Sequence, residues 1–349
     1  MTRLLLSAAV ALAAGLLACG SEAGTPDPGP APTGAPPAEV ATPGIPAKPS
    51  ASEPEPPRLG APYPVVLMHG MSGFGKLALG PIGISYFDGV VDDLTKNGES
   101  VYVTIVPPYD TSEARALALA KQIDVILKKT GKAKVNLVGH SQGGMDARVI
   151  TSPQGLAYGD RIASVTTVAT PHGGSKVADV VLGLLKDVPP EVIDSITGSL
   201  LSLIEKTAFE LQTDPHLRAQ LVELSEQHMS TVFNPKYKDA PGVLYMSYAG
   251  RTNLRAGVGV CDDGKYSNKP LDLDATQVAL APLAAFLEEG QFKVNDGLVT
   301  VKNAKWGVFQ QCVPADHLKE VGQLGPAASS FDHLQLFRDI VARVRNAGF

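Results

Sequence analysis

Cysteine, tryptophan and charge are all scarce in this chain of 349 residues. It has three cysteines and one tryptophan, and only 19% of its residues are charged. Three cysteines are too few for a small fold held together by disulfides. The net charge of −5 and the lack of a basic run argue against a nucleic-acid partner. With 44% hydrophobic residues, the length suffices for one large globular domain or two ordinary ones.

A long apolar run is also missing at the N-terminus. The segment from Leu4 to Leu17 is apolar but too short to be a stable bilayer anchor. It follows a positive start at Arg3 and leads into Leu-Leu-Ala-Cys, ending at Cys19, which resembles a bacterial lipobox whose cysteine is lipidated. We therefore expect residues 1–19 to be a lipoprotein signal peptide, with the exported protein anchored to the outer membrane or cell surface. A plain signal peptide and secretion are the alternative.

Proline is concentrated in the segment that follows. Half of the 28 prolines lie between Pro26 and Pro64, among Ala, Gly, Thr and Glu. Such a composition cannot bury apolar surface and favours an extended polyproline conformation. We interpret residues 20–62 as a disordered tether between the lipid anchor and the folded domain. A disordered start without a spacing role is the alternative.

Two cysteines remain after Cys19, namely Cys261 and Cys312. In an exported protein, an isolated pair of cysteines is typically oxidised. We therefore predict that they form a disulfide.

From Tyr63 onward, apolar strand patterns alternate with amphipathic helix patterns. A helix is predicted over residues 114–129, where apolar residues recur with helical spacing and Gly131 suits the C-cap. This alternation predicts an α/β fold over residues 63–349, with a mostly parallel central sheet and helices on both faces. The expected strands cover residues 64–68, 101–106, 135–138, 162–169 and 243–249.

One segment interrupts the alternation of strands and helices. Apolar helical stripes cover residues 177–185 and 193–204, separated by Pro189 and Pro190, and a third helix is a candidate over residues 216–228. We interpret residues 176–233 as an inserted helical lid over an apolar pocket. Ordinary core helices are the alternative.

Residues 135–144 read Val-Asn-Leu-Val-Gly-His-Ser-Gln-Gly-Gly. An apolar run therefore leads directly into the G-x-S-x-G pattern of a nucleophile elbow. The elbow is a tight strand-to-helix turn that exposes a serine hydroxyl, and its glycines let the strand and the helix pass closely. We predict that Ser141 is a catalytic nucleophile. A Gly-Ser loop without a catalytic role is the alternative, but it would not need the preceding strand.

A serine nucleophile needs a base, and the base needs an orienting acid, in the chain order Ser, Asp or Glu, His. Asp296, followed by Gly297 after an apolar segment, suits a turn that presents a carboxylate, although Asn-Asp-Gly is also ordinary turn chemistry. Two similar sequences offer the base, at His317 and at His333. We favour His317 because its surroundings are typical of a loop, whereas His333 begins a helix that Asp332 caps.

The tetrahedral intermediate also needs N–H groups that bind its negative oxygen. One donor is expected at Gln142, directly after the nucleophile. The other is expected at Met71, in the glycine-rich run His-Gly-Met-Ser-Gly-Phe-Gly at residues 69–75. Such a run could instead hold a phosphate, but it lacks the G-K-[ST] ending of a P-loop.

Four motifs occur in a characteristic order. They are His-Gly-Met-x-Gly-Phe at 69–74, Gly-His-Ser-Gln-Gly-Gly at 139–144, Ala-Thr-Pro-His-Gly-Gly-Ser at 169–175 and Asn-Asp-Gly-Leu-Val at 295–299. Together they resemble the triacylglycerol lipases of Gram-negative bacteria, which are α/β-hydrolases with a helical lid, from about Tyr63 to about Gly325. The resemblance implies the same roles as the residues do: Ser141, Asp296 and His317 for catalysis, and Met71 and Gln142 for the oxyanion hole.

The resemblance also implies a structural calcium, held by two aspartates and two backbone carbonyls. The first aspartate falls on Asp274, but the second falls on Lys319, and an ammonium group cannot ligate calcium. The calcium site is therefore degenerate, and we expect Lys319 to pair with Asp274 in place of the ion. A solvated surface lysine is the alternative. The disulfide also departs from the family, whose bridge closes soon after the acid, because Cys312 lies shortly before His317.

These features predict an exported hydrolase of carboxylic esters that acts on lipids, as a triacylglycerol lipase does, through a Ser-His-Asp acyl-enzyme mechanism without a catalytic cofactor. A carboxylesterase or polyester depolymerase is the alternative, and a catalytically silent surface binding protein is a more distant one. The expected partners are an ester substrate at an interface and, through the lipid anchor, a membrane. The sequence leaves open whether a dedicated folding chaperone is a further partner.

Overall fold

The computed structural model describes residues 62–73, 76–79, 82–252, 261, 265–267, 275–288, 293–323 and 331–349. The predicted signal peptide with Cys19, the tether up to residue 61, and Asp274 lie outside the described residues. Within the described part, no helix combines the length and the apolar character needed to cross a bilayer.

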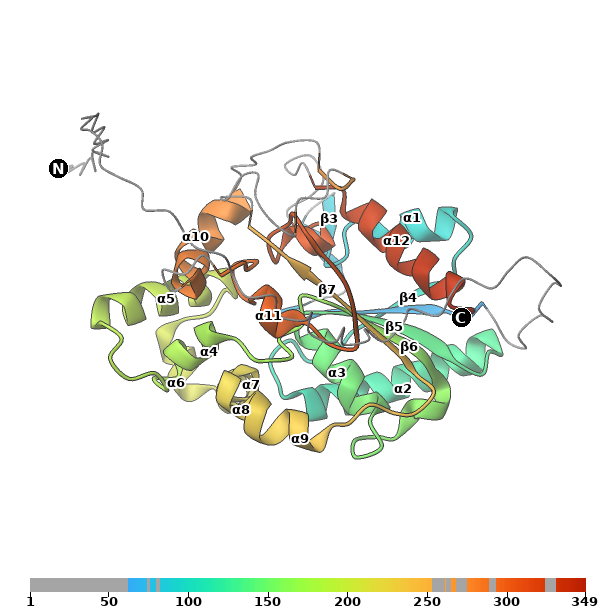
Figure 1. The fold of residues 1–349 in the computed structure, drawn as a ribbon, viewed down its shortest axis with the longest axis horizontal. Coiled ribbons are helices and arrows are strands. Elements are labelled where there is room, and N and C mark those ends of the chain that lie inside the picture. Colours follow the sequence, from blue (N-terminus) through green and yellow to red (C-terminus); the bar gives the residue numbers. More distant parts are fainter. Residues whose placement is uncertain are drawn as a thin grey trace, which may run out of the picture. The chain divides into compact units, whose positions relative to one another are not determined.

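A six-stranded parallel sheet forms the centre of the folded domain (Figure 1), with strand order β4-β1-β5-β6-β7-β8. The expected parallel sheet is therefore confirmed, while β8 and a separate antiparallel pair, β2 with β3, were not predicted. The strand bounds are β1 Val65–Met68, β2 Lys76–Leu79, β3 Ile82–Ser85, β4 Val101–Thr104, β5 Val135–His140, β6 Ile162–Val168, β7 Leu244–Gly250 and β8 Val308–Val313.

Both faces of this sheet are covered by helices, which explains why its strands are apolar runs rather than alternating ones. Successive strand residues point to opposite faces. Val66 and Met68 therefore join one core cluster, with residues of α2 (Ser112–Thr130) and α3 (Gln142–Thr151). Val65 and Leu67 join the other, with residues of α1 (Val90–Lys96) and α12 (His333–Asn346).

Helix α2 begins and ends as its sequence predicts. The side chain of Thr111 accepts a hydrogen bond from the N–H of Ala114 at the N-cap, which satisfies one of the first free donors. At the other end, Gly131 adopts a left-handed conformation with φ 65°, and its N–H bonds to the Leu127 carbonyl. The helix extends the predicted range by two residues at its start and one at its end.

The segment between β6 and β7 is helical and contains no strand. Pro190 occupies the first turn of α5 and Pro189 its N-cap, so the two prolines start this helix as well as ending the preceding stretch. The short helix α6 was not predicted. We call this segment the cap. It comprises α4 Lys176–Val181, α5 Pro190–Leu203, α6 Ala208–Thr213, α7 Pro215–Leu224, α8 Glu226–His228, a π-helical turn Met229–Phe233 and α9 Asn234–Lys236.

The remaining elements are α10 (Ala275–Glu288), α11 (Val301–Ala304) and single 3-10 turns at Tyr158–Arg161 and Lys319–Val321. The predicted disulfide between Cys261 and Cys312 is present, with a Cα–Cα distance of 4.5 Å. It fastens a loop that follows β7 to the end of β8, a few residues before His317.

Candidate active site

The turn after β5 has the geometry of a nucleophile elbow. Ser141 has a left-handed φ of 54° with ψ −130°, a conformation that costs energy in any residue with a side chain. Its N–H bonds to the Val168 carbonyl, and its own carbonyl accepts from the hydroxyl of Thr170. The strained turn is thus held on both sides, and Gln142 begins α3 directly after it.

Two glycines of the elbow are required by close backbone approaches. A Cβ on Gly139 would lie 2.5 Å from the nitrogen of Gly144, and a Cβ on Gly143 would lie 2.4 Å from the Met68 carbonyl oxygen. Real Cβ atoms do not approach that closely. The spacing in G-x-S-x-G therefore follows from the crossing of β5, α3 and the end of β1.

The loop after β1 brings Met71 beside the serine. A Cβ on Gly70 would lie 2.6 Å from the Cβ of Ser141, so only glycine permits this approach. The N–H of Gly70 donates to the hydroxyl of Tyr86 at 3.0 Å, and the N–H of Ser72 donates to the Pro108 carbonyl at 3.0 Å. The residues on both sides of Met71 are thereby fixed, as a preorganised oxyanion hole requires.

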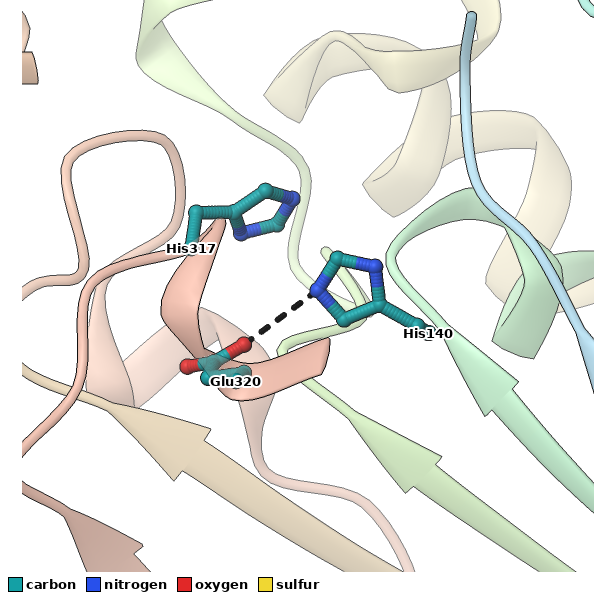
Figure 2. Close-up of side chains that lie close together, drawn as sticks. All are labelled: His140, His317 and Glu320. Atoms are coloured by element: carbon teal, nitrogen blue, oxygen red, sulfur yellow. Dashed lines mark ion pairs between the residues drawn. The ribbon is translucent and has the colours of Figure 1, made fainter. Parts of the chain in front are cut away.

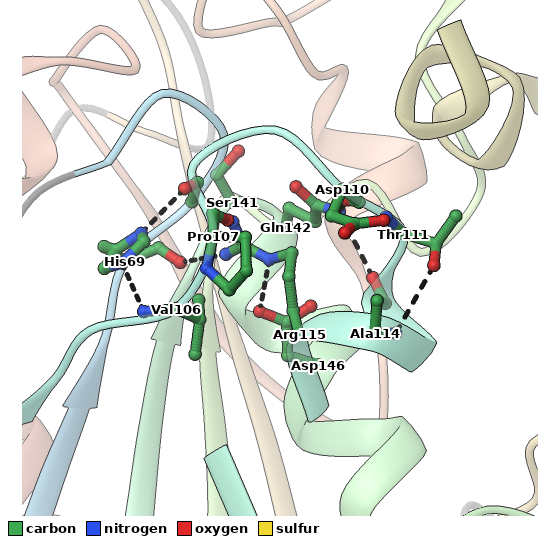
Figure 3. A network of polar contacts seen from close by, with 12 residues as sticks. His69, Val106, Pro107, Asp110, Thr111, Ala114, Arg115, Ser141, Gln142 and Asp146 are labelled. Atoms are coloured by element: carbon green, nitrogen blue, oxygen red, sulfur yellow. Dashed lines mark hydrogen bonds and ion pairs between the residues drawn. The ribbon is translucent and has the colours of Figure 1, made fainter. Parts of the chain in front are cut away.

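A buried arginine supports this loop from below (Figure 3). The guanidinium of Arg115, on α2, donates to the carbonyls of His69 and Pro107, at 2.7 Å each, and pairs with Asp146 of α3 at 2.9 Å. Burial and the neighbouring Arg115 lower the pKa of His69 to about 4. Its neutral ring accepts from the N–H of Val106 at Nε2, so Nδ1 carries the proton and donates to the Gly70 carbonyl.

The structure brings His317 and Asp296 together. Nδ1 of His317 lies 2.9 Å from Oδ2 of Asp296, and the N–H of His317 bonds to the Asp296 carbonyl at 3.0 Å. The other carboxylate oxygen accepts from the N–H groups of Leu298 and Val299, at 2.8 and 2.7 Å. Both side chains are buried. Because Nδ1 donates to the carboxylate, Nε2 is left as a proton acceptor on the pocket side.

The alternative base, His333, lies elsewhere. It stands in the first turn of α12, where Asp332 caps the helix as predicted, and its Nε2 bonds to the Asp88 carbonyl at 2.7 Å. Its ring packs against residue 322, which must be glycine. A Cβ at that position would lie 2.3 Å from Nε2 of His333. These contacts give His333 a structural environment, away from Asp296.

A buried carboxyl group beside His317 was missed at the sequence level. Glu320 lies 3.3 Å from Nε2 of His140, the residue before the nucleophile, and His317 lies next to both (Figure 2). Burial, with Asp296 and Asp316 nearby, raises the pKa of Glu320 well above its ordinary value, and burial lowers the pKa of His140 well below its own. Burial therefore favours the neutral form of both side chains.

Ser141, His317 and Met71 share one pocket, and the cap covers it. About 90 Å³ of free volume remains inside, which is well below the roughly 300–1,000 Å³ of a typical small-molecule site. The lining is largely apolar and comes from α4, α5, α7 and the loops around the acid and the base. Its apolar members are Met71, Pro171, Val177, Ala178, Leu200, Leu203, Ile204, Leu221, Leu224, Leu298, Val299 and Leu318.

At the position of the second calcium aspartate, the structure has the ammonium group of Lys319, which cannot ligate a cation. Lys319 is 2% exposed, and its Nζ lies 3.5 Å from Oδ2 of Asp316. The interpretation of Lys319 as a solvated surface lysine is therefore wrong. Asp274, its expected partner, lies outside the described residues. A cluster of His140, His317 and Glu320 places three ligand atoms within 4.8 Å of one another, but two of them are nitrogens, whereas calcium binds oxygen.

Comparisons with known proteins agree with this geometry. Residues 63–268 match the family model described as alpha/beta hydrolase fold. A triacylglycerol lipase of Vibrio cholerae is 32% identical over 82% of this chain and 88% of its own length. A triacylglycerol lipase of Burkholderia plantarii is 28% identical over 82% of this chain and 87% of its own.

Solved structures show the same fold. A Bacillus licheniformis lipase in its mature form has a TM-score of 0.57, with 84% of this chain and 96% of that chain covered at 19% identity. The Staphylococcus hyicus lipase has a TM-score of 0.55, with 85% and 99% covered at 17% identity.

The chain thus belongs to the α/β-hydrolase family, whose elbow and parallel sheet it has. Within that family it is a serine hydrolase, and the relatives to which it is similar are bacterial triacylglycerol lipases.

Proposed function

We propose that this enzyme hydrolyses lipid esters through an acyl-enzyme formed on Ser141. Nε2 of His317 takes the proton of the Ser141 hydroxyl as its oxygen attacks the ester carbonyl carbon. Asp296 keeps the proton on Nδ1 and stabilises the imidazolium that forms. The N–H groups of Met71 and Gln142 bind the oxygen that becomes negative. His317 then protonates the leaving alcohol, and a water molecule releases the acid by the same steps.

One observation carries this proposal more than the others. His317, which contacts Asp296 at 2.9 Å, lines the same apolar pocket as a serine in a strained elbow. A polar substrate would find few partners in this lining, whereas an acyl chain would bury apolar surface, at about 0.8 kcal/mol for each CH₂ group. The similarity to triacylglycerol lipases supports the same substrate class.

The small volume of the pocket bears on the size of the substrate. A long acyl chain does not fit in about 90 Å³, so a long-chain ester needs part of the cap to open. The same volume suits a short acyl chain, which favours a carboxylesterase as the second candidate. A polyester depolymerase would likewise need the cap to open.

Hydrolysis rates distinguish these candidates. We would measure p-nitrophenyl esters from acetate to palmitate, and emulsified triacylglycerol, below and above the solubility limit of each. A lipase with a movable cap shows a rise in rate when an ester interface forms, and it hydrolyses the emulsion. Equal specific rates on dissolved and emulsified ester, with activity confined to short chains, would support the carboxylesterase. Ser141→Ala should abolish activity on every ester, and a variant that still turns over would contradict the mechanism.

We further propose that the enzyme is exported and anchored to the outer membrane or cell surface through a lipid on Cys19. The support is the Leu-Leu-Ala-Cys sequence after a short apolar segment. Phase separation in a non-ionic detergent tests the proposal, because lipidated protein enters the detergent phase and Cys19→Ser protein does not. If both partition into the aqueous phase, the protein is secreted without an anchor.

A further inference from the structure

Helix α7 belongs to the cap, yet two of its polar side chains are buried against the catalytic loops. Gln220 is fully buried and Glu223 is 5% exposed. They are three residues apart and therefore lie on the same side of the helix, with the buried Leu217, Leu221 and Leu224. A buried amide and a buried carboxyl group are costly unless they are hydrogen-bonded, so their partners matter.

The amide of Gln220 contacts both sides of the oxyanion hole. Its Nε2 donates to Oε1 of Gln142, whose N–H is the first expected oxyanion donor. The same Nε2 lies 3.2 Å from the Pro108 carbonyl oxygen, which also accepts from the N–H of Ser72, next to Met71. Gln220 therefore contacts the donor residue Gln142 directly. It reaches the loop of the other donor, Met71, through the Pro108 carbonyl, which it shares with the N–H of Ser72.

The side chain of Gln142 completes this connection. Its Nε2 donates to the Asp110 carbonyl at 2.9 Å and lies 3.4 Å from the hydroxyl of Ser112. Since that NH₂ group faces acceptors, Oε1 must face a donor, and Gln220 supplies it. The first residue of α3 is thus held between the segment at 108–112 and helix α7 (Figure 3 shows Gln142 beside Asp110 and Ser141).

Glu223 fixes α7 to the start of α2. Its Oε2 accepts from the N–H of Ser112 at 2.7 Å, at the N-terminus of α2, and α2 carries Arg115, which holds the His69 carbonyl. By contrast, helix α5 is joined to the segment at 107–112 at its C-cap, where the Tyr109 hydroxyl donates to the Ile204 carbonyl at 2.7 Å. Two buried polar side chains of α7 therefore bond to the loops around Ser141. At the other end of the cap, the hydroxyl of Ser175, the N-cap of α4, donates to the Leu298 carbonyl at 2.6 Å.

We propose that Gln220 is a positioning residue for both oxyanion-hole donors. Helix α7 is then a fixed part of the active site, and the opening of the cap for substrate occurs in the segment from α4 to α6. The inference rests on the proposed function. It revises the predicted lid of residues 176–233, because the last part of that range supports catalysis instead of moving.

The test compares three variants of the full-length protein on dissolved p-nitrophenyl butyrate. Gln220→Met keeps the length of the side chain but cannot donate a hydrogen bond, and Val222→Ala is the control on the exposed side of the same helix. Direct loss of an oxyanion donor costs about 10²–10³ in kcat, so we expect misplacement to cost about tenfold, with KM within about twofold. Val222→Ala should leave both constants unchanged. Titration with a phosphonate ester counts the active molecules, so kcat refers to folded enzyme only.

Gln220→Glu provides a second measurement that a merely structural role would not affect. An ionised carboxylate can only accept, so it repels Oε1 of Gln142, whereas a protonated carboxyl group can donate to it. The ratio of variant kcat to wild-type kcat should therefore rise as the pH falls. The charged and titratable groups around this position are the same in both proteins, so their contributions to the pH profile cancel in the ratio. They are Glu223, Asp146, Asp110, Arg115 and His216.

Two results would overturn the inference. One is a kcat of Gln220→Met that lies within twofold of wild type while Ser141→Ala is inactive. In that case the role of Gln220 is wrong, but the proposed function still holds. The other is a Gln220→Glu ratio that does not change with pH. If instead Ser141→Ala retains activity, the proposed function itself fails, so the two failures are distinguishable.

Discussion

His317 and His333 stand in similar sequences, and replacing each with alanine should have opposite effects on activity and stability. In His317→Ala, the proposed proton acceptor for Ser141 is lost, and removal of a triad member lowers kcat by about 10⁴-fold or more. In His333→Ala, the pocket and the His317–Asp296 contact remain, so kcat per folded molecule should stay within about twofold of wild type.

The structure indicates how much stability His333→Ala should lose. The partly buried Asp88 carbonyl loses its bond to Nε2, at a cost of up to about 1–3 kcal/mol, the penalty for a buried unpaired group. The ring also leaves a cavity beside Gly322, whose cost depends on how far the neighbours relax. A loss of about 2–4 kcal/mol is a large part of a typical 5–15 kcal/mol, yet most molecules remain folded at 25 °C.

The assay combines urea unfolding, titration of active sites and initial rates on p-nitrophenyl butyrate for both variants. We expect His317→Ala to be folded and inactive, and His333→Ala to be less stable and active. A folded but inactive His333→Ala, or a His317→Ala within about tenfold of wild type, would refute the assignment of the base.

Three further predictions concern stability. Replacing Cys261 and Cys312 with serine opens a loop with a sequence separation of 51 residues, and calorimetry should show a loss of about 4 kcal/mol; an unchanged Tm would mean that the bridge is not formed in the purified protein. Burial, with Asp146 and Glu113 nearby, raises the pKa of Glu223 to about 7. The native state therefore binds this proton more tightly than the unfolded state does. The stability that the bound proton contributes is lost as the pH rises from about 4.5 to 7. The free energy of unfolding of Glu223→Gln should therefore exceed that of wild type by about 3 kcal/mol at pH 7 and equal it near pH 4. The same difference between the two proteins at both pH values would contradict this. Lys319→Met leaves Asp316 buried without its cation and should cost about 3–5 kcal/mol, while EDTA should not change wild-type activity; loss of activity that calcium restores would show that a metal site exists after all.

The parts of the fold that could be predicted from the sequence are those that depend on local pattern. Runs of apolar residues marked five of the strands, and Thr111 with Gly131 marked the ends of α2 closely. The edge strand β8 was missed because it begins with exposed or half-buried residues and includes two glutamines, so it shows neither a continuous apolar run nor clear alternation. Helix α6 was missed because it buries no residue, although its capping box at Thr207 and Glu210 was visible.

The candidate site divides in the same way. Ser141, Asp296 and His317 stand in motifs with glycines or turn residues that a close backbone approach requires, so their positions can be read along the chain. The environment of Lys319 could not be predicted in this way. The position of its partner Asp316 depends on a 3-10 turn and on a hydrogen bond from the hydroxyl of Thr276, on α10. Such contacts depend on how distant segments pack.

The supporting residues did leave a signal, which is a polar side chain in register with an apolar helical stripe. Arg115 precedes Leu119 and Ile123 by four and eight residues, so it points to the buried side of α2. Gln220 lies between Leu217 and Leu224 in the same way. A charged or amide group on a buried face must find hydrogen-bond partners, and here Arg115 and Gln220 find them in the segments around Ser141. A polar interruption of a buried stripe is therefore the sequence signal for the residues that we propose hold the oxyanion hole, whereas the conspicuous motifs mark only the groups that we propose contact the substrate.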